Sequence, residues 1–291
     1  FKLRNANLDH FDTIKNASAM EASNMNTSIQ VYNNLKQKIS FLYAKLKLYT
    51  LEKTKGRKLL IPIIEILTLA LFRARQNIAS KKSLAEIFNL QQHYKTLVVN
   101  LNRFSTLAAI ILSVMIRMNR NDAHFIKHTD STDLPVCLNK NAKHHKTMQL
   151  LAAWGKTGKG WFYGLKLHIT TDLKKKLLAV KFSSGNQSDR GIFLKLNHDL
   201  MGLFIADAGY LGEQLARDFF VEHQRMLIAR PRKNMKKLTT GIELLLYKTR
   251  MLIEWNFRCL KMTYGIVTSL PRSVDGYLAH YVYALTAFVL G

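Results

Sequence analysis

Residues 161–171 read Trp-Phe-Tyr-Gly-Leu-Lys-Leu-His-Ile-Thr-Thr, and this stretch is the strongest indication of the fold class. Polar and apolar side chains alternate along it and aromatic residues are frequent, which is typical of a β-strand with one buried face. Further strands are predicted before it at His124–Thr129 and after it at Leu177–Ser183. Three consecutive strand candidates indicate that this part of the chain builds a sheet.

The rest of the chain after residue 120 alternates between helix and strand patterns. We expect a helix at Asp189–Leu200, a short buried strand at Leu203–Ala206, a helix at Leu211–His223, a strand at Met226–Ala229 and a long helix at Ile242–Leu260. Three strands followed by helix, strand, helix, strand and helix indicate an α/β fold. The order is that of an RNase H-like mixed sheet with flanking helices, over residues 121–291.

The first 120 residues of the chain follow a different sequence pattern. Residues 1–30 are polar and lack periodicity, so a weakly ordered lead-in is predicted, whereas residues 31–120 follow a helical pattern. One apolar face recurs at intervals of three and four residues, at Leu35, Ile39, Leu42, Leu46 and Tyr49. A helix is expected at Leu59–Arg75.

A pair of short helices follows within this helical region. Ser83 and Glu86 have the spacing of a capping box, and a second short helix is predicted from His93 to Leu101. Helix, turn and helix in a basic chain fit a DNA-binding domain, although a plain corner of a helical bundle has the same pattern.

The net charge of the chain indicates which class of molecule it binds. The chain carries 44 Lys and Arg against 19 Asp and Glu, a net charge of +25, and both halves are basic. Such a surface attracts polyanions, nucleic acid first. Apolar residues make up 48%, which indicates a folded protein, and two cysteines provide no disulfide framework, which favours a reducing cytoplasm.

Targeting features point the same way. We expect no membrane association, because the longest apolar stretches fall short of the ~18 residues that span a bilayer. The N-terminal residues do not form a secretory signal, and a first residue Phe1 leads us to expect that the true N-terminus is missing.

Three acids occupy positions that suit chemistry. Asp130 follows the first predicted strand, Asp207 follows the fourth, and Glu254 lies on the last long helix. Residues at strand ends of an α/β sheet converge on one edge. Three carboxylates at that edge repel one another without a cation, and hard oxygen ligands of this kind suit Mg²⁺.

The neighbours of Glu254 sharpen this prediction. Tyr247, Arg250, Glu254 and Lys261 are spaced by three, four and seven residues, so one helix presents them on a single broad stripe. A carboxylate beside a phenol, a guanidinium and an ammonium fits a site where the acid holds metal and its neighbours hold phosphate.

Other polar residues have simpler interpretations. Asp133 competes with Asp130 as the first acid, but its place before Leu134-Pro135 favours a turn after the strand. Asp189 is expected to cap the helix that it begins. A zinc site is disfavoured, because the spacing of His124, His128, Cys137, His144 and His145 matches no established zinc pattern.

A run of motifs resembles one known family. Tyr-x2-Arg-x3-Glu-x6-Lys is the signature of a large group of DDE transposases from bacterial insertion sequences, and Tyr247, Arg250, Glu254 and Lys261 match it at every position. Other landmarks of the family occur in the usual order: His128-Thr-Asp-Ser131, Pro135-Val-Cys137, Gly160–His168, Gly185-Asn-x-x-Asp-Arg190, Ala206-Asp-x-Gly-Tyr210 and Arg232-Lys-Asn-Met-Lys236. Ala208 stands where the family commonly has Lys or another residue.

This resemblance implies a specific reaction. A DDE transposase cleaves phosphodiesters at the terminal inverted repeats of its element and joins the 3′-hydroxyl ends to target DNA. By the resemblance, Asp130, Asp207 and Glu254 would be both catalytic and metal-binding, holding two Mg²⁺ ions that Mn²⁺ can replace. Tyr247, Arg250 and Lys261 would bind DNA. A homodimer on DNA, associated with the nucleoid in a bacterial cytoplasm, is also expected.

Two other functions are compatible with these residues. A metal-dependent nuclease of the RNase H-like fold shares the three acids but does not join strands. A decayed or domesticated transposase that only binds DNA is the second alternative, and the complete signature argues against it.

Overall fold

The computed structural model describes residues 27–52, 58–210, 212–229 and 240–291. Most of the predicted polar lead-in therefore lies outside the described residues. The Arg232-Lys-Asn-Met-Lys236 landmark does so too.

Helices precede the sheet, as predicted. Residues 27–45 are helical, and α2 (Ile63–Arg75), α3 (Lys81–Ile87), α4 (Tyr94–Arg103) and α5 (Ser105–Asn121) follow. The predicted helix at Leu59 begins four residues later, directly after Pro62, whose fixed φ suits a position at a helix start. Leu35, Ile39 and Leu42 are buried, as their spacing predicts, whereas Tyr49 is exposed.

The predicted capping box at Ser83 and Glu86 is wrong. The N-cap of α3 is Ser80, whose hydroxyl accepts a hydrogen bond from the backbone N–H of Ser83 at 2.9 Å. Ser83 therefore lies in the first turn of the helix. Two hydroxyl residues three apart allow two cap positions, and the structure takes the earlier one.

The sheet contains strands in both orientations. Its strands are β1 (Ile126–Pro135), β2 (Ala153–Thr157), β3 (Gly160–Asp172), β4 (Leu177–Ser184), β5 (Leu203–Ala206) and β6 (Met226–Ala229). The order is β2-β3-β1-β5-β6, and β4 also pairs with β3. The first four strands pair antiparallel, while β1, β5 and β6 run parallel. This mixed sheet with flanking helices agrees with the predicted RNase H-like order, to which the structure adds β2.

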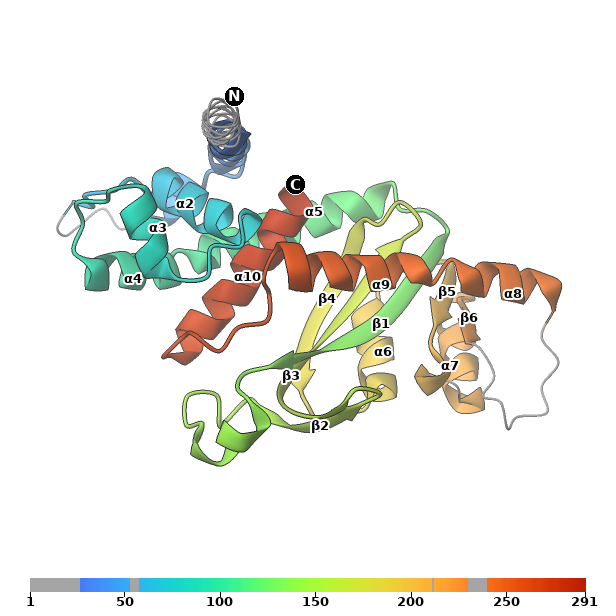
Figure 1. The fold of residues 1–291 in the computed structure, drawn as a ribbon. Coiled ribbons are helices and arrows are strands. Elements are labelled where there is room, and N and C mark those ends of the chain that lie inside the picture. Colours follow the sequence, from blue (N-terminus) through green and yellow to red (C-terminus); the bar gives the residue numbers. More distant parts are fainter. Residues whose placement is uncertain (1–26, 53–57, 211, 230–239) are drawn as a thin grey trace, which may run out of the picture.

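Helices cover both faces of the sheet (Figure 1). On one face, α6 (Asp189–Asn197) and α7 (Glu213–His223) enclose a small aromatic core around Phe193, Phe204 and Phe219. On the other face, α9 (Met251–Arg258) places Ile253 and Phe257 in a larger core.

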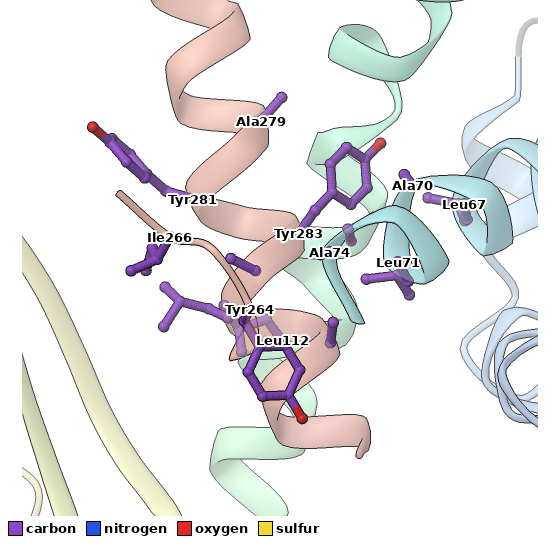
Figure 2. Close-up of a cluster of buried hydrophobic side chains, with 14 of the residues drawn as sticks. Leu67, Ala70, Leu71, Ala74, Leu112, Tyr264, Ile266, Ala279, Tyr281 and Tyr283 are labelled. Atoms are coloured by element: carbon purple, nitrogen blue, oxygen red, sulfur yellow. The ribbon is translucent and has the colours of Figure 1, made fainter. Parts of the chain in front are cut away.

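The last helix, α10 (Val274–Leu290), returns to the N-terminal helices (Figure 1). Figure 2 shows side chains of α10 beside Leu67 and Leu71 of α2 and Leu112 of α5. The Tyr283 hydroxyl donates to the carbonyl of Leu101 at 2.8 Å. The helices before residue 121 thus share one continuous hydrophobic core with the end of the chain.

The N-terminal helices also bond directly to the sheet. Asn119 and Arg120 at the end of α5 donate to the carbonyls of Leu177 and Leu178 at 3.0 and 2.7 Å. These bonds hold α5 against the start of β4. The sequence pattern changes near residue 120, but in the structure the segments before and after this position pack against each other.

One helical stretch, Tyr94–Asn121, is long and apolar enough by composition to span a membrane. It consists of α4 and α5, which are separated at Phe104, and α5 packs against α10 in the core. A buried core helix passes the same test of length and composition, so the stretch is weak evidence for a membrane.

Candidate active site at the edge of the sheet

The register of β1 and β5 places two of the predicted acids, Asp130 and Asp207, at the same position along the strand direction. The parallel pairing of β1 with β5 places His128 opposite Ile205. Asp130 lies two residues beyond His128, and Asp207 lies two residues beyond Ile205. Because parallel strands advance together, both carboxylates reach the same edge of the sheet. Asp207 follows the end of β5, as predicted.

Asp130 is inside β1, not after it. The strand continues to Pro135, because its antiparallel pairing with the long β3 extends from Lys127 to Pro135. Asp133, expected in a turn, pairs with Lys166 within the same ladder. The prediction that the strand ends at Thr129 is therefore wrong, and both acids of this segment are held by a regular strand.

The third acid comes from a helix that is broken where the sequence predicts continuity. The expected helix at Ile242–Leu260 is divided into α8 (Gly241–Lys248) and α9, and Cys259–Thr263 forms a π-helical turn. At the break, Thr249 Oγ1 lies 2.7 Å from His128 Nε2. This contact ties the junction of α8 and α9 to β1, two residues from Asp130.

Arg250, at the same break, contacts two of the acids. Its Nη2 donates to Asp130 Oδ2 at 2.6 Å, and its Nη1 donates to Glu254 Oε1. The Tyr247 hydroxyl donates to Asp207 Oδ1 at 3.3 Å. Arg250 therefore joins Asp130 and Glu254, and Tyr247 from the preceding helix bonds to the third acid, Asp207.

Burial and neighbouring charges shift the pKa values of Asp130 and Arg250. Burial raises the pKa of Asp130 to about 6, although Arg250 acts in the opposite direction, and the negative charge of Asp207 raises it further. Burial alone would lower the pKa of Arg250, but Asp130, Asp207 and Glu254 outweigh that effect and raise it. The guanidinium thus lies in the field of all three acids.

The donor set suits a hard divalent cation, because carboxylate oxygens are the ligands that Mg²⁺ takes in proteins. Within the described residues, however, no group of three or more His, Cys, Asp or Glu side chains is arranged to hold a metal ion. The guanidinium of Arg250 bonds to two of the carboxylates and offsets part of their negative charge. The chemistry of the donors fits a metal, and Arg250 is the group that such an ion would displace.

Lys261 does not share the environment of the other three signature residues. It lies in the π-helical turn, and its Nζ forms an ion pair with Asp133 Oδ1 at 3.0 Å. The four signature residues therefore do not share one site. Tyr247 and Arg250 bond to the three acids, of which Glu254 is one, while Lys261 binds a different carboxylate on β1.

Polar residues on α6 support the same edge and were not predicted to do so. Asp189 was expected to cap α6, but its Oδ1 accepts from Ser131 Oγ at 3.0 Å and from Lys166 Nζ at 3.2 Å. Arg190 Nε donates to the carbonyl of Gly209 at 2.9 Å. One helix start therefore bonds to both segments that carry the aspartates. The Gly185-Asn-x-x-Asp-Arg190 landmark was the signal in the sequence.

A parallel–antiparallel sheet with carboxylates converging at one edge defines an α/β protein with a candidate phosphoryl-transfer site. A family model described as a transposase DDE domain matches residues 120–274, just over half of the chain. The protein therefore belongs to the transposase DDE domain family, as its motifs predicted. DNA is the substrate of this family, and its members typically use divalent metal ions.

Proposed function

We propose that this protein catalyses DNA transposition by cleaving phosphodiester bonds at terminal inverted repeats and joining the freed 3′-hydroxyl ends to target DNA. The observation that carries the proposal is the convergence of Asp130, Asp207 and Glu254 around Arg250. Membership of the transposase family supports it.

In this proposal Asp130, Asp207 and Glu254 hold Mg²⁺, with two ions per site and Mn²⁺ as a substitute. When bound, such ions activate a nucleophilic oxygen and stabilise the leaving oxygen of a phosphodiester. Arg250 and Tyr247, which bond to the acids in the DNA-free protein, turn to phosphate oxygens of the substrate. Lys261 leaves Asp133 to bind a further phosphate.

We further propose that the helices of residues 31–120 bind the ends of the element and that two copies act together on DNA. The net charge of +25 favours association with DNA, and with it a place beside the nucleoid. Sedimentation of the protein with and without a repeat-containing duplex tests the dimer. A 1:1 complex under all conditions would contradict it.

The reaction is tested on the protein's own DNA. Sequencing of the DNA that flanks the gene should reveal short inverted repeats bounded by direct duplications. Incubation of those ends with Mg²⁺ and the protein should nick the repeat tip, and Asp207→Asn should not. Binding without any metal-dependent cleavage would instead assign a DNA-binding role.

Cleavage and joining are separated by a second assay. A pre-cleaved end with a free 3′-hydroxyl, incubated with supercoiled target DNA, should be joined covalently to it. Cleavage of the repeats without joining would identify a nuclease. Glu254→Gln should abolish both reactions while binding of the repeats stays close to that of the unmodified protein.

A further inference from the structure

A basic groove lies between the turn at residues 173–176, α9 and the C-terminal ends of α2 and α10. Its volume of about 470 Å³ is within the range of small-ligand sites. The lining residues that bear on its chemistry are Arg75, Lys174, Lys175, Lys176, Trp255 and Cys259. Such a groove is too small for a DNA duplex but can hold part of a single strand.

The charge of the groove is largely uncompensated. Four of its lining residues are cationic, and none is Asp or Glu. Lys176 pairs with Asp122 at 2.6 Å, whereas Lys174 and Lys175 form no ion pair with any residue that the structure describes. The guanidinium of Arg75 donates to a neutral tyrosine hydroxyl. An anionic ligand, such as a phosphodiester, fits this surface.

An aromatic side chain accompanies the cations. Trp255 is 51% exposed and immediately follows Glu254 on α9. Lys175 Nζ lies 5.2 Å from the centroid of its ring. The Asn256 side chain donates to the carbonyl of Lys175 at 3.3 Å, which fixes the lysine turn to the helix. Cations and an exposed aromatic ring together are typical of sites for single-stranded nucleic acid.

We propose that this groove binds an unpaired DNA strand, with phosphates on Lys174, Lys175 and Arg75 and a base stacked on Trp255. The proposal rests on DNA being the substrate of the proposed function. An unpaired base is required, because the faces of paired bases are covered by their neighbours in a duplex. Trp255 follows Glu254 on α9, so one helix carries both a wall of the groove and one of the three acids.

Fluorescence of Trp255 tests the groove directly. The chain has three tryptophans, so Trp154→Phe with Trp161→Phe leaves Trp255 alone. A short oligothymidylate added without metal should quench this fluorescence to saturation, whereas a blunt duplex of the same length should quench it far less. Trp255→Leu in the unmodified background should weaken binding of the oligonucleotide on the order of tenfold.

Two matched double variants, each of which removes two positive charges, test the contribution of the lysines. Lys174→Gln with Lys175→Gln should reduce the slope of log affinity against log salt by about 1.4, since each single-strand phosphate contact contributes ~0.7. Lys195→Gln with Arg217→Gln removes the same charge on the opposite face of the sheet, at α6 and α7, and should leave the slope unchanged. Equal effects of the two double variants would overturn the groove as a specific site.

Cys259 gives an independent, position-specific test. It lines the groove, whereas Cys137 lines a different pocket. In a Cys137→Ser protein, an oligonucleotide carrying a thiopyridyl disulfide should form a mixed disulfide with Cys259 and release thiopyridone. The adduct should form with a single strand and be lost in the Lys174→Gln, Lys175→Gln variant. Equal yields with a single strand and with a duplex would contradict the proposal.

These results separate the groove from the reaction. Saturating quenching without metal-dependent cleavage would support the groove and overturn the proposed transposition. Cleavage of the repeats without quenching or cross-linking would retain transposition and overturn the groove. Absence of binding to any DNA would overturn both.

Discussion

Asp130 and Asp133 lie three residues apart on β1, but their carboxylates have different environments. Asp130 bonds to Arg250 at 2.6 Å, and Asp133 pairs with Lys261 at 3.0 Å. Burial raises the pKa of Asp130 to about 6. Burial also acts to raise that of Asp133, but the hydrogen bond and the charge of Lys261, together with a backbone hydrogen bond and the charge of Lys159, outweigh it and lower the pKa.

An ion pair therefore does not by itself identify a structural residue. Asp133 has one cation to itself, whereas Asp130 shares a guanidinium with Glu254 and lies near Asp207. Crowded carboxylates with too little positive charge are the arrangement that favours uptake of a metal ion. We therefore propose that Asp130 takes part in the reaction and that Asp133 supports the local fold.

The largest expected effect is on the cleavage rate, and it tests the different roles of Asp130 and Asp133. Asp130→Asn should reduce metal-dependent cleavage of the repeats by on the order of 10³-fold, because a neutral amide is a poor ligand for a divalent cation. Asp133→Asn should reduce it by less than about tenfold, as expected for a residue away from the reacting atoms. Initial rates on a labelled repeat-end duplex measure both. Equal losses in the two variants would end the distinction.

Metal affinity provides the next contrast. Arg250→Ala removes the cation that bonds to Asp130 and Glu254, so the DNA-free protein should bind Mn²⁺ roughly tenfold more tightly. Calorimetry in the absence of DNA measures this directly. Lys261→Ala is the matched control and should leave the Mn²⁺ affinity unchanged. Weaker binding in Arg250→Ala would show that the guanidinium supports the metal site.

The opposite pKa shifts predict different responses to pH. Protons compete with metal for Asp130 below its raised pKa of about 6, so Mn²⁺ affinity should fall roughly tenfold between pH 7 and pH 5. The lowered pKa of Asp133 keeps that side chain ionised over the same interval. Asp133→Asn should therefore leave the pH profile of metal binding unchanged. A flat profile in the unmodified protein would contradict the raised pKa.

The smallest effect concerns stability. Loss of the Asp133–Lys261 pair in Asp133→Asn should cost about 1 kcal/mol, a decrease in Tm of about 2 °C for a domain of this size. Thermal unfolding followed by circular dichroism measures it. A double-mutant cycle with Lys261→Met isolates the pair, and a coupling energy near zero would show that the contact adds nothing to stability.

Much of the fold follows from local pattern. The alternation at 161–171 predicts β3, and the short apolar run at 203–206 predicts β5 with Asp207 directly after it. Family membership was also evident in the sequence, because the motif spacing is independent of how segments pack. Periodicity and motifs reflect the preferences of neighbouring residues, which an amino-acid sequence displays directly.

Element ends were less predictable. β1 runs past Thr129 because β3 offers it partners as far as Pro135. The helix before Glu254 breaks at Thr249 and Arg250, where Thr249 meets His128 on β1 and Arg250 meets Asp130. Both features depend on a segment about thirty or more residues away, which no local pattern reports.

The acids and cations of the protein, their spacing, its basic charge and its family can all be read from the amino-acid sequence. Which charges meet depends on the folded chain: Arg250 bonds to Asp130 and Glu254, and Lys261 pairs with Asp133. Lys174 and Lys175 line the groove. The reason is the short range of these interactions. An ion pair or hydrogen bond needs atoms within a few ångströms, and the register of β1 with β5 and the packing of α9 on β1 set those distances.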